Sequence, residues 1–306
     1  MKFDAAMNEI NRRVFLQRSV TGAAAVSILA EHSSIAASSR APGIIDTNIN
    51  LFDWPFRALK YRDTESLVAK LKKHRVIQAW AGSFEALLAK DMNGVNERLA
   101  AECHRNGRGF LIPFGSVNIA WPDWEEDLRR CQEVHKMPGI RIYPGYQPFD
   151  LNHPEMEKLI RSVAERRLLL QIVFGMEDPR VYHPIIDVGP VTFAPLAKLT
   201  TSIPEARIQL LHFPNSPQGN DFAEFIRRPN TYVEISRFEG NGAIGRMIGT
   251  VEGLPSLRAP ADRILFGSHA PYFPVETAIL KLIESPLDES QVRSITRENA
   301  QRLIAA

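Results

Sequence analysis

The sequence predicts a single-domain α/β protein with the (β/α)₈ architecture of a TIM barrel. From residue 44 onward, short apolar runs alternate with amphipathic segments eight times in about 265 residues. The runs are nearly continuous in apolar residues, as expected for parallel strands that are covered on both faces. The chain has 306 residues, 44% hydrophobic and 24% charged, which is enough for a sizeable core and typical of a globular protein.

Eight strands are expected in chain order, at residues 44–49, 76–81, 111–117, 139–143, 168–174, 207–213, 232–236 and 264–268. A doubly wound open sheet is the alternative arrangement for such an alternation. It is disfavoured because Asp46-Thr47-Asn48 follows the first apolar residues, where a dinucleotide-binding fold carries its glycine-rich phosphate fingerprint.

Local signals mark the ends of the predicted helices. Asp123, with Glu126 three residues later, predicts a capping box. Pro154 suits the first position of a helix, and Gly107 suits a helix C-terminal cap. Residues 290–304 are expected to form a closing helix.

The two cysteines, Cys103 and Cys131, continue the apolar faces of two predicted helices. Free buried thiols are therefore expected. A disulfide is the alternative in an oxidising compartment, and the spacing of the two residues matches no metal motif.

Residues 1–40 predict a twin-arginine signal peptide and linker, which leaves residues 41–306 for the barrel domain. Arg12-Arg13-Val14-Phe15-Leu16-Gln17 fits the twin-arginine pattern, a weakly apolar segment follows at 19–30, and Ser34-Ile35-Ala36 supplies small residues for cleavage. We therefore expect export, to the periplasm. A disordered or amphipathic N-terminus that carries two arginines by chance is the alternative.

Charge and hydropathy limit the classes of partner. A formal charge of +2 gives no reason to expect nucleic-acid binding. No run of eighteen or more apolar residues is present, so stable membrane insertion is not expected. A small-molecule substrate is the expected partner, and homo-oligomer formation stays open.

In a barrel, the site forms at the C-terminal ends of the strands and in the loops that follow them. The polar residues found at these ends are Asp46, Asn48, Asn50, Arg141, Tyr143, Gln171, His212, Glu234, Ser236, Arg237, Ser268 and His269. The longest irregular stretch, residues 175–190, follows the fifth strand and is expected to form a lid over the site.

Six segments resemble the amidohydrolase superfamily, in the branch called amidohydrolase-related or metal-dependent hydrolases of the TIM-barrel fold. They are "IIDTNIN", "GIRIYP", "LLLQIVFG", "IQLLHF", "ILFGSHAPYFPVETAILKL" and "TRENAQRLI". The resemblance covers essentially the whole chain after the signal, and it is more specific for the fold than for any reaction.

The resemblance implies a divalent metal held by a His-x-His pair on strand one, histidines after strands five and six, and an aspartate after strand eight. The metal would activate a water, and the aspartate would take its proton. In this sequence Asn48 and Asn50 occupy the pair, Val173 stands at the strand-five position, His212 matches the strand-six ligand, and His269 replaces the aspartate. Two imidazoles make an incomplete zinc site, so the ligand set does not support a conventional metal.

A charged loop and an aromatic segment suggest a group of site residues above the barrel mouth that differs from the family's metal ligands. Glu177, Asp178, Arg180 and His183 come from the loop after strand five, and Trp54 and Arg57 follow strand one. A branch of the family is similar at both segments and also carries Gly-Ser-His at strand eight. A solvated rim is the alternative for the loop, and Glu234 is expected to pair with Arg141 inside the barrel.

The leading hypothesis is a hydrolase acting on a small carbonyl, lactone or amide substrate without the usual metal. His269 would be the general base, with His212 and Arg141 polarising the carbonyl oxygen. Arg57 or Arg180 would hold a substrate carboxylate. The residues expected to bind substrate are Asn48, Asn50, Trp54, Arg57, Tyr143, Glu177, Asp178, Arg180, His183 and Glu234.

Two alternatives stay open. One is a non-catalytic ligand-binding protein on a hydrolase barrel, which would explain the missing ligands. The other retains a metal, held by His212, His269 and a lid carboxylate from Glu177 or Asp178.

Overall fold

The structure, a computed structural model, describes residues 43–213, 220–251 and 258–305, which belong to one compact unit. The expected twin-arginine motif and the cleavage segment lie outside the described residues. None of the helices within these ranges combines the length and apolar character needed to cross a bilayer.

Eight parallel strands alternate with helices, as the sequence predicts. The strands are β1 (Ile44–Leu51), β2 (Val76–Ser83), β3 (Leu111–Pro113), β4 (Gly139–Ile142), β5 (Leu169–Val173), β6 (Arg207–Leu211), β7 (Thr231–Glu234) and β8 (Ile264–Leu265). All eight lie at the expected places, although β1 and β2 run two residues further and β3 and β8 end earlier than predicted.

The strands close into a barrel through two seams between the sheets β1-β2-β3 and β4-β5-β6-β7-β8. At the first seam, the Arg141 backbone N–H donates to the Gly115 carbonyl at 2.7 Å. At the second, the Thr47 N–H donates to Phe266 O and the Asn50 N–H donates to Ala270 O, both at 2.9 Å. This closure confirms the TIM barrel and excludes the open doubly wound sheet.

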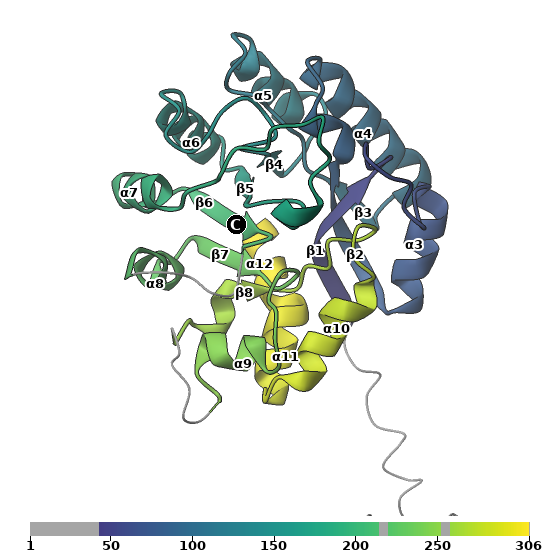
Figure 1. Ribbon diagram of the computed structural model, residues 1–306, viewed down its shortest axis with the longest axis vertical. Helices are drawn as coiled ribbons and strands as arrows, with labels where there is room; N and C mark the ends of the chain where they lie inside the picture. The colour runs from purple at the N-terminus through teal and green to yellow at the C-terminus, as the bar shows by residue number, and fades with distance from the viewer. Residues whose placement is uncertain (1–42, 214–219, 252–257, 306) are drawn as a thin grey trace, which may run out of the picture. The chain divides into compact units, whose positions relative to one another are not determined.

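Helices surround the strands as an outer ring, from α3 round to α8, with the chain's C-terminal helices closing the circle (Figure 1). The α-helices are α3 (Thr64–Lys73), α4 (Met92–Gly107), α5 (Trp124–Glu133), α6 (Met156–Glu165), α7 (Ala194–Ser202), α8 (Asn220–Arg227), α9 (Ala243–Ile248), α10 (Val275–Glu284), α11 (Glu289–Arg293) and α12 (Asn299–Ala305). Short 3₁₀ turns are η2 (Phe84–Leu87), η3 (Pro179–Val181) and η4 (Ala261–Arg263), and a π-helical segment, η5 (Ser294–Glu298), joins α11 to α12. The closing helix therefore forms where expected, with a π turn inside it.

The main apolar core lies between this helical ring and the outer faces of the strands. Helix α6 is an example of how the helices pack. Its buried residues follow the i, i+3, i+4, i+7 spacing of one helix face and are Met156, Leu159, Ile160 and Val163. Each such side chain contributes about 1.5–3 kcal/mol when it is removed from water.

The barrel interior also carries a hydrogen-bonded polar layer, here called the interior belt, in addition to a buried apolar cluster that includes Trp80, Leu169 and Leu265. Arg141 Nε donates to Gln171 Oε1 at 2.8 Å, Gln171 Nε2 to Gln209 Oε1 at 2.9 Å, and Gln209 Nε2 to Thr47 Oγ1 at 2.7 Å. Strand register aligns Arg141, Gln171 and Gln209 on β4, β5 and β6 at one level. The belt therefore ties β1, β4, β5 and β6 together beneath the mouth.

The capping box predicted at Asp123 is wrong. Asp123 is the N-cap of α5, but its side chain accepts no capping hydrogen bond, because its backbone (φ −95°, ψ 14°) is not extended. The Glu126 carboxylate is bound by Arg129 instead, at 2.7 Å to both Nε and Nη2.

Two further predictions of helix ends are wrong. Pro154 lies in the turn before α6 and not at its first position. Gly107 is the last residue of α4, and the left-handed residue that follows the helix is Gly109, with φ +75°. Cys103 and Cys131 are confirmed as free, buried thiols.

Candidate functional site

Two histidines lie ring against ring at the C-terminal end of the barrel. The ring centroids of His212 and His269 are 3.8 Å apart, with the planes tilted by 44°. His212 follows β6 and is 2% exposed, and His269 follows β8 and is fully buried. The structure thus brings together the two histidines that the sequence nominated.

Both histidines adopt the left-handed backbone conformation, with φ of 56° at His212 and 60° at His269. This region is unfavourable for residues with a Cβ, and it persists where the surrounding structure enforces it. The His269 N–H donates to Asn48 O at 2.8 Å, and the His212 N–H donates to Glu234 Oε1 at 2.7 Å. Contacts from neighbouring strands therefore hold both side chains toward the same point.

The lid fixes the orientation of the His269 ring. His269 Nε2 lies 2.9 Å from the carbonyl oxygen of Met176, at the start of the lid. Because a carbonyl can only accept, the neutral ring carries its proton on Nε2 and its lone pair on Nδ1. Nδ1 has no hydrogen-bond partner in the described part of the chain.

The His212 ring is also unsatisfied. Neither of its nitrogens meets hydrogen-bond geometry with any described residue, although the Gly175 backbone lies close enough to favour the protonated form weakly. Three of the pair's four ring nitrogens are therefore buried without a partner. Such groups cost free energy unless a ligand or water satisfies them.

Burial keeps both imidazoles neutral. It lowers the pKa of His269 from 6.5 to about 3 and the pKa of His212 well below 6.5, and His269 itself lowers the pKa of its neighbour further. Arg141 and Arg237 add smaller effects in the same direction. A pair of neutral rings can accept hydrogen bonds from a ligand at neutral pH, but while they stay buried such low pKa values make them weak bases.

Glu234 supports the pair from below. This fully buried carboxylate accepts hydrogen bonds from Asn48 Nδ2 at 3.1 Å, from the His212 N–H, and from the Ser236 N–H and hydroxyl at 2.5 and 2.7 Å. Only glycine fits at position 267, because a Cβ there would come within 2.8 Å of Glu234 Cδ. The ion pair predicted between Glu234 and Arg141 is wrong, since Glu234 is committed to these other donors.

Asp46 is a site residue that the sequence reasoning did not single out. Its Oδ1 accepts from the backbone N–H groups of Asn48 at 3.1 Å and Ser268 at 3.0 Å, and its Oδ2 has no partner among the described residues. Burial raises the pKa of Asp46 from 3.8 to about 7, and the Glu234 charge adds to that increase. In the sequence, the position of Asp46 at the end of an apolar strand could have identified it as a candidate site residue.

A latch of three side chains covers the histidine pair. The Tyr272 hydroxyl donates to Glu177 Oε2 at 2.9 Å, its ring stacks on His269 with centroids 4.8 Å apart, and the Arg57 guanidinium lies 4.8 Å above that ring. Glu177 is 4% exposed, and burial raises its pKa. Tyr272 was not predicted, although it lies only three residues after His269 of the Gly-Ser-His motif.

Above the latch lies a pocket of about 580 Å³, here called the mouth pocket. Its walls are aromatic and its polar groups are mostly charged. The lining residues are Trp54, Phe56, Arg57, Glu177, Asp178, Val181, Tyr182, His183, Pro184, Arg237, Glu239, Tyr272 and Phe273. Five residues that were predicted to bind substrate line it. Phe273, Arg237 and Tyr182 also line it but were not among the predicted site residues, because only the folding of the loops brings them to the pocket.

Arg141, which was predicted to be catalytic, and Asn50 and Tyr143, which were predicted to bind substrate, do not line this pocket. Arg141 Nη1 donates to Ile49 O at 2.8 Å and to Asn50 Oδ1 at 2.9 Å, while Tyr143 donates its hydroxyl to Ser83 O at 3.1 Å. Arg141, Asn50 and Tyr143 are all fully buried. These residues are structural partners of one another, and the Arg141 guanidinium has its donors already committed.

Two opposite charges at the rim of the lid, those of Arg180 and Asp178, neutralise each other. Arg180 lies 2.6 Å from Asp178, is 88% exposed at its side chain, and does not line the pocket. Bonding by Arg180 lowers the pKa of Asp178. His183 stacks on Phe56 at 5.5 Å. Arg57, and not Arg180, is thus the predicted guanidinium that faces the pocket.

The donor set does not fit the divalent metal that the resemblance implies. Within the described ranges, no three His, Cys, Asp or Glu side chains gather as a group that could hold a metal ion. Of the lid carboxylates that could complete such a group, Asp178 is paired with Arg180, and Glu177 accepts from Tyr272 through Oε2, while its Oε1 has no partner among the described residues. A zinc site needs at least three protein ligands.

Comparisons with solved structures agree on the fold. The chain is similar to the 2,6-dihydroxybenzoate decarboxylase from Rhizobium (17% identity, 86% of this chain and 99% of that one, TM-score 0.63). It is also similar to a dihydroxybenzoic acid decarboxylase from Polaromonas sp. JS666 with bound manganese and 2-nitroresorcinol (16%, 86% and 97%, TM-score 0.67). A putative amidohydrolase from Staphylococcus aureus matches at 12% identity over 86% of this chain and 100% of that one, with a TM-score of 0.64.

No curated protein sequence matches this chain. The sequence profile of the amidohydrolase family, Amidohydro_2, matches residues 46–305, which span the barrel from the first strand to the last helix. The chain therefore belongs to the amidohydrolase family.

Proposed function

We propose that this protein is a hydrolase that acts on a small carbonyl substrate, a lactone, ester or amide, bound in the mouth pocket. The observation that carries the proposal is the histidine pair beneath the lid, in which three of four ring nitrogens are buried and have no hydrogen-bond partner among the residues that the structure describes. Unsatisfied imidazoles held by strained backbone at strand ends are typical of catalytic positions.

The chemistry follows from the tautomer of His269. When the latch opens and water reaches the ring, the burial that lowers its pKa is relieved; its free Nδ1 then takes a proton from a water molecule, whose oxygen attacks the carbonyl carbon. His212 donates a hydrogen bond to the carbonyl oxygen as it gains negative charge. The proton on His269 passes to the leaving oxygen or nitrogen, which completes the hydrolysis.

The pocket supports a flat substrate that carries a carboxylate. Trp54 makes edge contacts with the rings of Phe56 and Tyr272 at 5.3 and 5.2 Å, so the pocket presents aromatic surfaces at right angles. Arg57 forms no ion pair with a described carboxylate and is free to bind one from a ligand. The latch must shift for such a ligand to reach His269, because that ring is fully buried.

Decarboxylation of an aromatic acid is a second candidate function. The same aromatic walls and the facing guanidinium favour it, and structural neighbours include decarboxylases of dihydroxybenzoates. In that reaction the carboxylate leaves as carbon dioxide and the ring carbon takes a proton. A ligand-binding protein without turnover is the remaining alternative.

A substrate panel distinguishes these functions. Lactones, aryl esters and anilides are monitored for hydrolysis, and hydroxybenzoates for released carbon dioxide, with wild type, His269→Gln and the exposed control His104→Gln. We expect hydrolysis that falls at least about 100-fold in His269→Gln and is unchanged in His104→Gln. Turnover that survives His269→Gln removes His269 from the mechanism, and carbon dioxide alone establishes the second candidate.

Metal analysis tests the metal-free part of the proposal. We expect the purified protein to contain much less than one equivalent of zinc or manganese, because the donor set is incomplete. One equivalent that disappears in His212→Ala would establish a metal enzyme.

We also propose that the protein is exported through the twin-arginine route, on the basis of Arg12-Arg13 and the residues that follow. A fusion of residues 1–40 to a reporter should appear in the periplasm and should stay in the cytoplasm when both arginines are replaced by lysine.

A further inference from the structure

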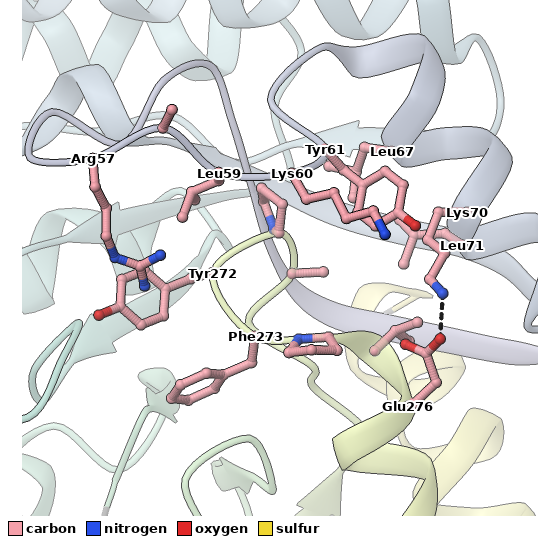
Figure 2. A pocket seen from close by; sticks show the side chains of 15 residues that line it. Arg57, Leu59, Lys60, Tyr61, Leu67, Lys70, Leu71, Tyr272, Phe273 and Glu276 are labelled. Atoms are coloured by element: carbon pink, nitrogen blue, oxygen red, sulfur yellow. Dashed lines mark hydrogen bonds and ion pairs between the residues drawn. The ribbon is translucent and has the colours of Figure 1, made fainter.

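A second pocket lies beside the mouth pocket, on the other side of the Arg57–Tyr272 stack. It has a volume of about 340 Å³ and is formed by the loop after β1, one face of α3 and the start of α10, so we call it the α3–α10 pocket. Figure 2 shows Arg57 and Tyr272 at one end of this pocket and Lys60, Lys70 and Glu276 at the other.

The floor of the pocket is aliphatic. Leu59, Leu67, Leu71 and Val275 line it and are almost fully buried, with exposures of 7, 2, 0 and 1%. The mouth pocket, by contrast, is walled mainly by aromatic rings. The two pockets are therefore suited to different apolar groups, a flexible chain here and a flat ring there.

The rim of the α3–α10 pocket is cationic. The ammonium groups of Lys60 and Lys70 lie 5.5 and 5.6 Å from the centre of the Tyr61 ring, so they gather at one place. Glu276 is the one carboxylate in the lining; it is paired with Lys70, and His74 Nε2 lies 3.1 Å from its Oε1. Lys60 forms no ion pair with any carboxylate that the structure describes.

These features fit an anionic head group on an apolar body. Lys60 and Arg57 give the pocket an excess of positive charge that no lining carboxylate neutralises. A carboxylate placed at the Lys60 end would leave its chain over the leucines of α3. The volume lies at the lower end of the range for small-ligand sites.

We propose that the α3–α10 pocket is a second ligand site that binds a small aliphatic carboxylate, and that Arg57, Tyr272 and Phe273, which line both pockets, form the wall between it and the mouth pocket. The proposal does not depend on the reaction at the histidine pair, because binding can be measured without turnover.

Calorimetry with hexanoate and its neutral counterpart hexanamide tests the proposal on the full chain. We expect hexanoate to bind, to bind more weakly as salt is raised, and to bind far more tightly than hexanamide. Lys60→Gln should raise the Kd about threefold and Lys60→Glu about tenfold, as expected for an exposed charge pair and its reversal. No binding to wild type, or equal affinity for hexanamide, would overturn the proposal.

Two control variants locate the site. Lys73→Gln removes an exposed positive charge from the same helix, outside the pocket lining, and should leave the Kd unchanged. His183→Ala alters only the mouth pocket and should also leave it unchanged. A Kd that responds to His183→Ala but not to Lys60→Glu would assign the ligand to the mouth pocket and refute the second site.

Discussion

Burial shifts the pKa values of the site's histidines and of Asp46 in opposite directions. The stability of the protein therefore depends on pH in a testable way. Burial lowers the pKa of His269 to about 3 and also lowers that of His212, while it raises the pKa of Asp46 to about 7. Below pH 6.5 the unfolded chain binds protons on the two histidines that the folded chain does not, so acid destabilises the fold. Asp46 acts oppositely, because between pH 3.8 and 7 only the folded chain protonates it.

His269→Gln should weaken this acid sensitivity. At pH 5 the buried neutral ring of His269 costs about 2 kcal/mol relative to its unfolded form, and glutamine carries no such cost. Urea unfolding at pH 7.5 and pH 5 should therefore show a smaller loss of unfolding free energy in the variant than in wild type. The exposed His104→Gln should behave as wild type, and equal losses in all three proteins would contradict the depressed pKa.

Asp46→Asn should have the opposite effect. The amide oxygen can still accept from the N–H groups of Asn48 and Ser268, but the group no longer gains a proton as the pH falls. Wild type gains about 2.5 kcal/mol from Asp46 between pH 7.5 and pH 5, and the variant lacks this gain. Its acid-induced loss of stability should thus be steeper, and a shallower pH dependence would show that Asp46 is ionised in the fold.

At this scale the sequence predicts where candidate site residues lie better than it predicts their environments. His212 and His269 follow strands at positions that a motif identifies. The roles of Asp46 and Tyr272 depend on contacts across the barrel, with Ser268 in one case and Glu177 in the other. Such partners, far apart in sequence, leave no local pattern.

Among the elements, the lid is the one most closely linked to function. It is fastened to the barrel by the contact from Met176 to His269 and by the hydrogen bond from Tyr272 to Glu177. Both contacts come from the segment after β8, so the lid and the Gly-Ser-His loop form one unit over the histidine pair. The proposed function requires this unit to open, because the His269 ring is fully buried beneath it.

Tyr272→Phe should loosen the lid without removing the ring that covers His269. A hydrogen bond to a buried carboxylate stabilises by about 1.5–3 kcal/mol, so amide exchange at lid residues 176–190 should increase at least about tenfold. Mass spectrometry of hydrogen exchange measures this. Tyr232→Phe, which removes a hydroxyl at the opposite end of β7, should leave lid exchange unchanged, and a lid equally protected in both variants would exclude the latch.

The positions of the elements could be predicted, but several of their ends could not. Apolar runs in the sequence predicted all eight strands, because a strand that is buried on both faces consists almost entirely of apolar residues. The ends at Asp123 and Gly107 depend on backbone angles of single residues, which the surrounding packing sets. Side-chain signals alone therefore misplaced the caps of α4 and α5.

On the scale of the whole molecule, the barrel is closed by polar contacts as much as by apolar packing. The interior belt joins four strands, and its central charge, Arg141, is fully buried and forms no ion pair with any described carboxylate. Family resemblance predicted the barrel but suggested a catalytic Arg141, because sequence cannot show that Gln171 and Asn50 already occupy its donors. A strand-end residue in such a barrel can thus serve the fold instead of the reaction.

Arg141→Met separates these two roles. The variant leaves Gln171 Oε1, Asn50 Oδ1 and the Ile49 carbonyl without their buried donor, so it should lose at least about 3 kcal/mol of unfolding free energy. Urea unfolding measures the loss, and Arg161→Met, which removes an exposed i,i+4 ion pair on α6, should cost less than about 1 kcal/mol. If Arg141→Met were as stable as Arg161→Met yet lost turnover, Arg141 would be a catalytic residue and the belt would be dispensable for closing the barrel.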